Sequence, residues 1–310
     1  MPEQTALDLA RIRAPDTEAL GSLHPEVTRA LTDAGMLRRW VAAECGGEAA
    51  SVTDGLRTIE ATAKADGAAG WCVMIANTTA LTSHRVRSDW AETIYRDPAA
   101  CTGGFGMPAG TATLVDGGLE VTGRWAWGSG TDHCTWIGGG VRVVDAAGEK
   151  ALTGDGAFAP FVFFDPSDVE LLDTWHVAGL KGTASTDYAV SKAFVPEGRW
   201  ANLLSDSPVV DSPLGRFPFF GALGAGVAAC LIGLGERAIE EIVALAVLIA
   251  AAWGVRRLSR RLAGTRAVRG RPALRTALAS VGGPGGEATA VVLATSTSWS
   301  SMGAASAVTQ

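Results

Sequence analysis

The chain has 310 residues, of which 47% are hydrophobic and 19% charged, a balance that suits one large or two to three small globular domains and excludes general disorder. Its net charge of −6 gives no reason to expect a nucleic-acid partner. Five scattered cysteines without a CxxC pair argue against a disulfide framework and against a metal site, and they fit a reducing cytoplasm.

Residues 1–100 are predicted to form an N-terminal helical domain. The N-terminal segment carries acidic residues and has no apolar core region, so no signal peptide is expected. Helix signals then follow in order: a helix from Pro25 to Gly35, a second that begins at Ser51 or Thr53, a buried helix over 71–80 and a fourth over 87–96.

Residues 101–205 have the composition of a β domain. Glycine pairs and triplets separate short apolar runs at 119–122, 136–137, 141–144, 161–164 and 189–194. Short strands with turn signals between them predict an antiparallel barrel or sandwich. The central domain is therefore expected to be all β.

Residues 206–246 return to helix after a proline-containing loop. Apolar side chains recur at helical spacing from Val227 to Leu245, as in the first helix of a C-terminal bundle. Helices, then strands, then helices indicate an α+β fold. The longest apolar run, Ile242–Val255, is about 14 residues, shorter than the ~20 that span a bilayer, so it predicts a buried helix and no membrane segment.

The last segment, 247–310, reverses the charge of the chain. It holds eight arginines, one acidic residue (Glu287), no lysine and no aspartate, a net of +7, whereas residues 1–246 carry −13. Such a reversal marks a boundary. Residues 247–310 are therefore treated as an atypical tail rich in Arg, Ala, Gly and Ser.

The most informative motif is the segment Val121–Trp136, VTGRWAWGSGTDHCTW. Ser129 lies between two glycines, which let backbone amides approach a flat ligand closely. Its hydroxyl can hydrogen-bond a ring nitrogen, and Trp127 can stack on an aromatic ring. A β-hairpin with a glycine-flanked turn and core tryptophans explains the same residues without a ligand.

This segment resembles the flavin-contacting strand and loop of the acyl-CoA dehydrogenase superfamily. Its pattern Trp-x-x-x-Ser-Gly-x-x-His-x-x-Trp is similar to that of the two-component flavin-dependent monooxygenases within the superfamily. Further blocks agree in order and spacing at 34–47, 65–71, 104–110, 173–197 and 224–246. The resemblance therefore extends from residue 34 to residue 246.

The resemblance implies a cofactor site. Ser129 takes the position of the hydroxyl that hydrogen-bonds flavin N5, with Gly130 beside it. Trp127 takes the aromatic position next to the ring. Phe105 and Met107 occupy the preceding loop on the flavin side.

Two further candidate site residues match the family pattern less closely. Lys181 stands where hydroxylase relatives often have arginine, and an ammonium lacks the bidentate fork of a guanidinium. His133, near the flavin loop, is the candidate catalytic residue, a general base toward substrate. The alternative for His133 is a histidine hydrogen-bonded in the barrel wall.

The function implied is that of a flavin-dependent oxidoreductase, with the hydroxylase-like motif favouring a monooxygenase. Such an enzyme takes reduced FMN or FAD from a partner flavin reductase and uses dioxygen to hydroxylate a small aromatic or polyketide-like substrate. One alternative is an FAD-dependent acyl-CoA dehydrogenase, whose catalytic Glu would belong to the C-terminal bundle. Another is an inactive truncated remnant.

The resemblance ends near residue 246, where family members continue with three more helices of a bundle through which they form homo-oligomers. An arginine-only basic segment is what a GC-rich gene yields when it is read out of frame, so the bundle is expected to be missing or frameshifted here. Translating the two other reading frames tests this expectation. The rival explanation is a genuine basic tail, with 255–278 as an amphipathic helix that binds an acidic partner.

Overall fold

The computed structural model describes residues 2–145, 147–148, 152–153, 156–157, 159–204 and 207–282. The chain divides into two compact units, Met1–Gly235 and Glu236–Gln310. The first unit combines helices with a seven-stranded sheet, so the α+β expectation is confirmed. The boundaries expected near residues 100, 205 and 246 stay predictions.

The helical part of the first unit agrees with the sequence signals. Its helices are α1 (Pro2–Leu20), α2 (Pro25–Asp33), α3 (Val52–Ala65), α4 (Gly67–Ala80) and α5 (Ser88–Tyr95), with 3-10 turns η1 (Ala43–Cys45) and η2 (Leu81–His84). Ser51 caps α3 by accepting from the backbone N–H of Asp54. Asp66 caps α4 through two backbone amides, and burial raises the pKa of its carboxyl. Both caps supply acceptors to amides that a helix leaves unpaired.

The sheet has the strand order β7-β8-β2-β1-β3-β6-β9. Its strands are β1 (Thr102–Val115), β2 (Gly118–Gly128), β3 (Trp136–Val144), β6 (Phe161–Phe164), β7 (Glu170–Leu172), β8 (Thr186–Pro196) and β9 (Trp200–Ala201). The short strands β4 (Leu152–Thr153) and β5 (Gly156–Ala157) pair with each other. The 3-10 turns η3 (Thr131–His133), η4 (Pro166–Asp168) and η5 (Lys181–Thr183) lie between the strands.

One strand pair departs from the antiparallel sheet that the sequence predicted. β1 and β3 are parallel, whereas the other pairs described in this sheet are antiparallel. After the β1–β2 hairpin the chain crosses through η3 and returns on the opposite side of β1, so β3 must run in the direction of β1. The sheet is therefore mixed.

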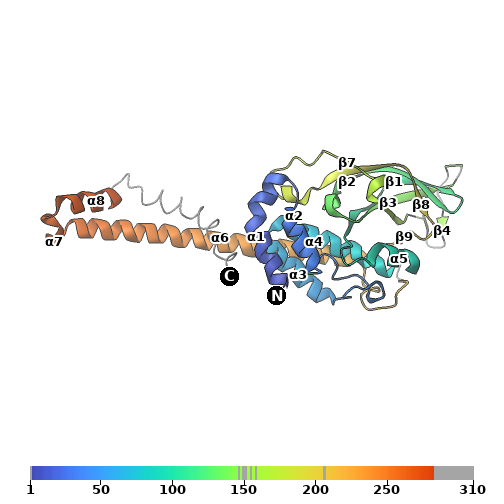
Figure 1. The fold of residues 1–310 in the computed structure, drawn as a ribbon, viewed down its shortest axis with the longest axis horizontal. Helices are drawn as coiled ribbons and strands as arrows, with labels where there is room; N and C mark the ends of the chain where they lie inside the picture. The colour runs from blue at the N-terminus through green and yellow to red at the C-terminus, as the bar shows by residue number, and fades with distance from the viewer. Residues whose placement is uncertain are drawn as a thin grey trace. The chain divides into compact units, whose positions relative to one another are not determined.

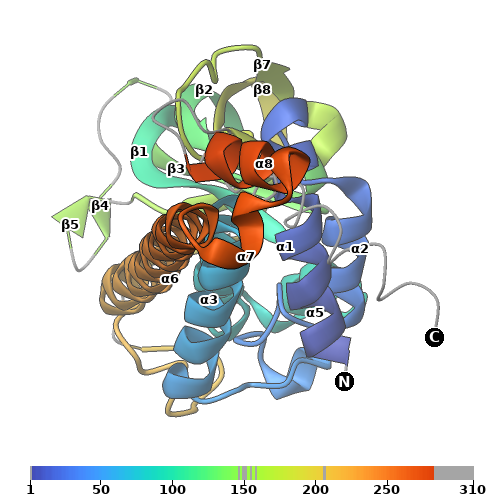
Figure 2. The same cartoon turned by 90° about the vertical axis from the view of Figure 1, so that its left-hand side faces the viewer.

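The sheet lies over the helices α3, α4 and α5 (Figures 1 and 2). Strand β6 shows how the two layers share residues. Phe161 and Phe163 belong to the helix-side core, while Val162 and Phe164 belong to a second core within the sheet. Successive side chains of a strand point to opposite faces, so this short apolar strand contributes to both cores.

The second unit consists of the remainder of α6 (Phe219–Ala263) together with α7 (Arg266–Arg269) and α8 (Pro272–Gly282). Helix α6 continues past residue 246, where the family resemblance ends, and includes the apolar run Ile242–Val255. Ile242 is 67% exposed, so the expectation that Ile242–Val255 is a buried helix is wrong here, because the described part of this unit offers only two short helices to cover it. The predicted amphipathic helix over 255–278 is divided among α6, α7 and α8.

By length and composition alone, α6 could cross a membrane. This observation weighs little, because the core helix of a soluble protein can meet the same two criteria.

Candidate functional site

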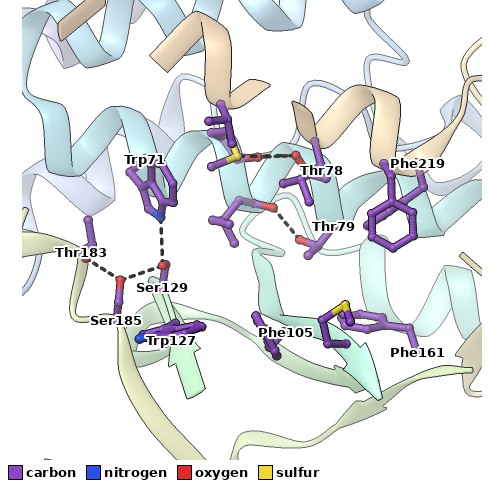
Figure 3. Close-up of a pocket in the computed structure, with 18 of the residues that line it drawn as sticks. Trp71, Thr78, Thr79, Phe105, Trp127, Ser129, Phe161, Thr183, Ser185 and Phe219 are labelled. Carbon is purple, nitrogen blue, oxygen red and sulfur yellow. Dashed lines mark hydrogen bonds between the residues drawn. The ribbon is translucent and has the colours of Figure 1, made fainter. Parts of the chain in front are cut away.

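A pocket of about 580 Å³ opens in the first unit between α4 and the sheet. Its walls come from α4, the start of β1, the loop after β2, the loop that precedes β8 and the first turns of α6, as Figure 3 shows. The described lining includes no charged side chain; its polar side-chain groups are the indole N–H groups of three tryptophans and five hydroxyls, those of Thr78, Thr79, Ser129, Thr183 and Ser185. Such a concave, mostly apolar cavity with a few polar groups is typical of a small-molecule site.

Two aromatic side chains from the sheet form one wall of the pocket. Phe105 of β1 and Trp127 of β2 meet edge to face, with ring centroids 6.0 Å apart and an interplanar angle of 77°. Trp127 is 63% exposed. The predictions that Phe105 and Trp127 share a ligand site stay untested, but the fold brings both to one pocket.

Trp127 has an unusual backbone conformation. Its φ is +59°, and it lies where the β2–β8 register shifts between Trp125 and Gly128. Positive φ is rare for a bulky residue, and such conformations gather at ligand sites, where the surrounding structure holds them. The bulge turns the Trp127 ring into the pocket lining.

Ser129, close to Trp127, is the centre of a hydrogen-bond network in the pocket wall (Figure 3). It is 5% exposed and lines the pocket. The indole Nε1–H of Trp71 donates to Ser129 Oγ at 3.0 Å, and Ser129 Oγ lies 2.7 Å from Ser185 Oγ. Ser185 Oγ lies 2.6 Å from Thr183 Oγ1, and Thr183 donates to the carbonyl oxygen of Leu180 at 2.9 Å.

The segment of β1 that carries Phe105 is held by Tyr188. The Tyr188 hydroxyl accepts from the backbone N–H of Phe105 at 2.9 Å and donates to the carbonyl oxygen of Gly138. Tyr188 is fully buried and stacks on Trp125 at 5.3 Å and 14°. Met107, further along β1, also lines the pocket and is 58% exposed.

Three predicted site residues lie next to the pocket rather than in its lining. Gly130 has a φ of +70°, and its N–H donates to the carbonyl oxygen of Thr183 at 2.8 Å, which joins the Ser129 loop to η5. Lys181 is half exposed, and its Nζ lies 3.7 Å from Glu18 Oε1. The cofactor roles predicted for Gly130 and Lys181 remain predictions.

His133 is the third of these residues. Its Nδ1 lies 3.0 Å from Asp132 Oδ1, and its ring lies against the α-carbon of Gly130. Burial by itself lowers the pKa of His133, but hydrogen bonds to Asp132 and Cys101 outweigh it and raise the pKa to about 10. The predicted role as a base toward substrate stays a prediction; the contacts that raise the pKa of His133 favour its imidazolium form beside Asp132.

Sequence reasoning did not assign roles to Trp71, Thr183 and Ser185, although all three line the pocket and contact one another or Ser129. Each lies in a block that carries the family resemblance, at 65–71 or 173–197. Those blocks were the available signal. Only the fold shows that the two blocks meet at Ser129.

No family model matches the chain. A pigment production hydroxylase of Rhodococcus sp. is 30% identical over 252 residues, 74% of this chain and 60% of the relative. The oxygenase subunit HsaA of a flavin-dependent monooxygenase from Rhodococcus jostii is 32% identical over 200 residues, 62% of this chain and 49% of the relative. The chain thus spans about half to three fifths of the length of these curated relatives.

Solved structures share the fold. The crystal structure of the HsaA monooxygenase from M. tuberculosis has a TM-score of 0.71 at 25% identity, covering 81% of this chain and 70% of that one. XiaF from Streptomyces sp., solved with FADH2 and glycerol, has a TM-score of 0.67 at 22% identity, covering 94% and 79%. TdsC from Paenibacillus sp. A11-2, solved with FMN and indole, has a TM-score of 0.65 at 15% identity, covering 90% and 75%.

Proposed function

We propose that this chain, which is similar to oxygenase components of two-component flavin-dependent monooxygenases with the acyl-CoA dehydrogenase fold, binds a reduced flavin in its pocket for the oxygenation of a small aromatic substrate. The observation that carries the proposal is the placement of Ser129 Oγ, held by Trp71 and Ser185 in the wall of an apolar pocket with Phe105 and Trp127. The same pocket accepts a polyketide-like aromatic system.

The residues present fit a flavin ring. A flat, mostly apolar heterocycle needs apolar walls and a few hydrogen-bonding groups at its polar edge. Phe105 and Trp127 offer aromatic surface, while Ser129 Oγ keeps one lone pair beyond its bonds to Trp71 and Ser185. Ser129, Phe105, Met107 and Trp127 would hold the ring, with Gly130 shaping the loop.

When bound, a reduced flavin supplies electrons to dioxygen and so provides the oxygenating chemistry. The residues of this chain position and shield the reaction. Ser129 hydrogen-bonds the ring edge, and Trp71 fixes the Ser129 hydroxyl. The apolar side chains of α4 and of the first turns of α6 exclude water, which protects reactive intermediates from hydrolysis.

In this proposal the protein is cytoplasmic and receives its reduced flavin from a partner flavin reductase. The flavin is FMN or FAD. The pocket is compatible with either flavin, because the contacts proposed above involve only the ring system that FMN and FAD share. Homo-oligomers through a helical bundle are proposed only for a chain in which that bundle is intact.

The decisive experiment compares cofactor supply. Purified protein should be colourless, and it should consume oxygen with an aromatic substrate only when a reductase and NAD(P)H provide reduced flavin. Ser129→Ala should lower that oxygen-dependent product formation. A yellow protein that passes electrons to an artificial acceptor without oxygenation would favour an acyl-CoA dehydrogenase, and failure to bind any flavin would indicate an inactive remnant.

A further inference from the structure

A chain of hydroxyl groups runs from the pocket into the protein. It begins at Ser129 Oγ, passes through Ser185 Oγ and Thr183 Oγ1, and ends at the backbone carbonyl oxygen of Leu180 (Figure 3 shows its three side chains). Ser129, Thr183 and Ser185 are each at most 5% exposed, so the hydrogen bonds within the chain are shielded from bulk water.

The end of this chain fixes the direction of each hydrogen bond. A carbonyl oxygen can only accept, so Thr183 must donate its one hydrogen to Leu180. Thr183 Oγ1 then accepts from Ser185, and Ser185 Oγ in turn accepts from Ser129. The hydrogen of Ser129 is therefore donated to Ser185 Oγ and is not available to a pocket ligand.

One lone pair of Ser129 Oγ is also occupied by a hydrogen bond. The indole Nε1–H of Trp71 is a donor only, so it occupies one of the two lone pairs of Ser129 Oγ at 3.0 Å. One lone pair remains. Toward a ligand in the pocket, Ser129 is thus an acceptor and not a donor.

We infer that Ser185 and Thr183 are positioning residues that make the site selective for the reduced form of the flavin. This inference rests on the proposed function, in which Ser129 contacts flavin N5. In reduced flavin N5 carries a hydrogen and donates, whereas in oxidised flavin N5 only accepts. An acceptor at Ser129 therefore matches the reduced ring and leaves the oxidised ring facing an unpaired lone pair.

The test is the ratio of dissociation constants for oxidised and reduced flavin, measured by anaerobic titration with FMN or FAD. Wild type should bind the reduced form more tightly. Ser185→Ala removes the acceptor of the Ser129 hydrogen, which can then turn to oxidised N5. Thr183→Val lets Ser185 donate to Ser129, with the same effect at N5.

In each variant the oxidised-to-reduced ratio should fall roughly tenfold, because one hydrogen bond is exchanged for an unpaired polar group. Equivalently, the two-electron potential of the bound flavin should fall by about 30 mV. Thr183→Ser keeps the hydroxyl and should restore the ratio. Thr111→Val, at an exposed position of β1, is the matched control for loss of a threonine hydroxyl and should leave the ratio unchanged.

Ratios within twofold of wild type in both Ser185→Ala and Thr183→Val, with flavin still bound, would overturn the inference while leaving the proposed function intact. If Ser185→Ala does not fold, the isosteric Thr183→Val decides alone. Wild-type protein that binds neither flavin form would instead overturn the proposed function, and the inference with it.

Discussion

The indole of Trp71 and the hydroxyl of Ser129 lie 58 positions apart in the chain and meet through a 3.0 Å hydrogen bond. Trp71 belongs to the buried helix α4, and Ser129 follows the end of β2. The bond therefore ties the helical layer to the sheet at the wall of the pocket, as Figure 3 shows. It also links two of the sequence blocks that carry the family resemblance, 65–71 and 121–136.

Trp71→Phe tests this tie. The variant keeps an aromatic ring but loses the N–H that holds Ser129, at a cost of about 1 kcal/mol, so flavin affinity should fall roughly fivefold. Titration with reduced flavin measures it. Trp90→Phe is the matched control, because Trp90 also donates its indole N–H, to the carbonyl oxygen of Glu197, away from the pocket. Equal losses in both variants would contradict a specific role for Trp71.

Tyr188→Phe should disturb the segment of β1 around Phe105. The change leaves the N–H of Phe105 and the carbonyl oxygen of Gly138 without their buried partner, which should lower the free energy of unfolding by about 1–3 kcal/mol and also weaken flavin binding. Urea denaturation and flavin titration measure the two effects. Tyr95→Phe is the comparison: the Tyr95 hydroxyl is also buried but bonds Thr82 and the carbonyl oxygen of Thr79 in place of the Phe105 strand, so stability should fall while flavin binding weakens less than in Tyr188→Phe.

Gly104→Ala should be strongly destabilising, whereas Gly224→Ala should not. Gly104 has a φ of +129°, and a methyl group there would collide with the backbone of Gly138 across the parallel β1–β3 pair. We expect a loss of about 2–4 kcal/mol in the free energy of unfolding. Gly224 lies in α6 with open space around its α-carbon, so alanine should stabilise by about 0.5–1 kcal/mol. Thermal unfolding of both variants checks the contrast.

The raised pKa of His133 predicts a pH dependence of stability. A histidine whose pKa is about 10 in the folded protein and near 6.5 when unfolded binds a proton more tightly in the folded state. Its contribution is fully present below about pH 6.5 and is lost as the pH rises to about 10. Asp132→Asn removes the carboxylate that holds the imidazolium, so the unfolding free energy of the variant should change less between pH 7 and pH 10 than that of wild type.

The thiol of Cys101 changes the free energy of unfolding with pH in the direction opposite to that of His133. Its hydrogen bond with Cys134, together with His133, lowers the pKa of the Cys101 thiol although burial opposes the shift. A lowered thiol pKa adds stability as the pH rises through the folded-state pKa toward the ordinary thiol pKa. The comparison should therefore be repeated in a Cys101→Ser background. If the pH profiles of Asp132→Asn and its parent coincide there, the Asp132–His133 pair does not titrate as described.

Local sequence signals determined the helices and most strands. Proline at the start of α2, the Ser51 cap of α3 and the apolar run in α4 act through neighbouring residues, so they can be read directly from the chain. Strand β1 was harder to predict, because GGFGMPAG is rich in residues that are depleted in strands. Its place in the sheet depends on pairing with β2 and β3, and that pairing is not a local property.

Some residues of the candidate site were likewise predictable from the sequence, whereas others were identified only from the tertiary structure. The motif around Ser129 and the aromatic residues Phe105 and Trp127 was identified from the sequence, because their types and spacing carry the family resemblance. Only the tertiary structure brought Trp71, Thr183 and Ser185 to Ser129, since hydrogen bonds between residues far apart in the chain form when helix and sheet pack together. The same packing left His133 outside the pocket lining, which its position in the motif could not reveal.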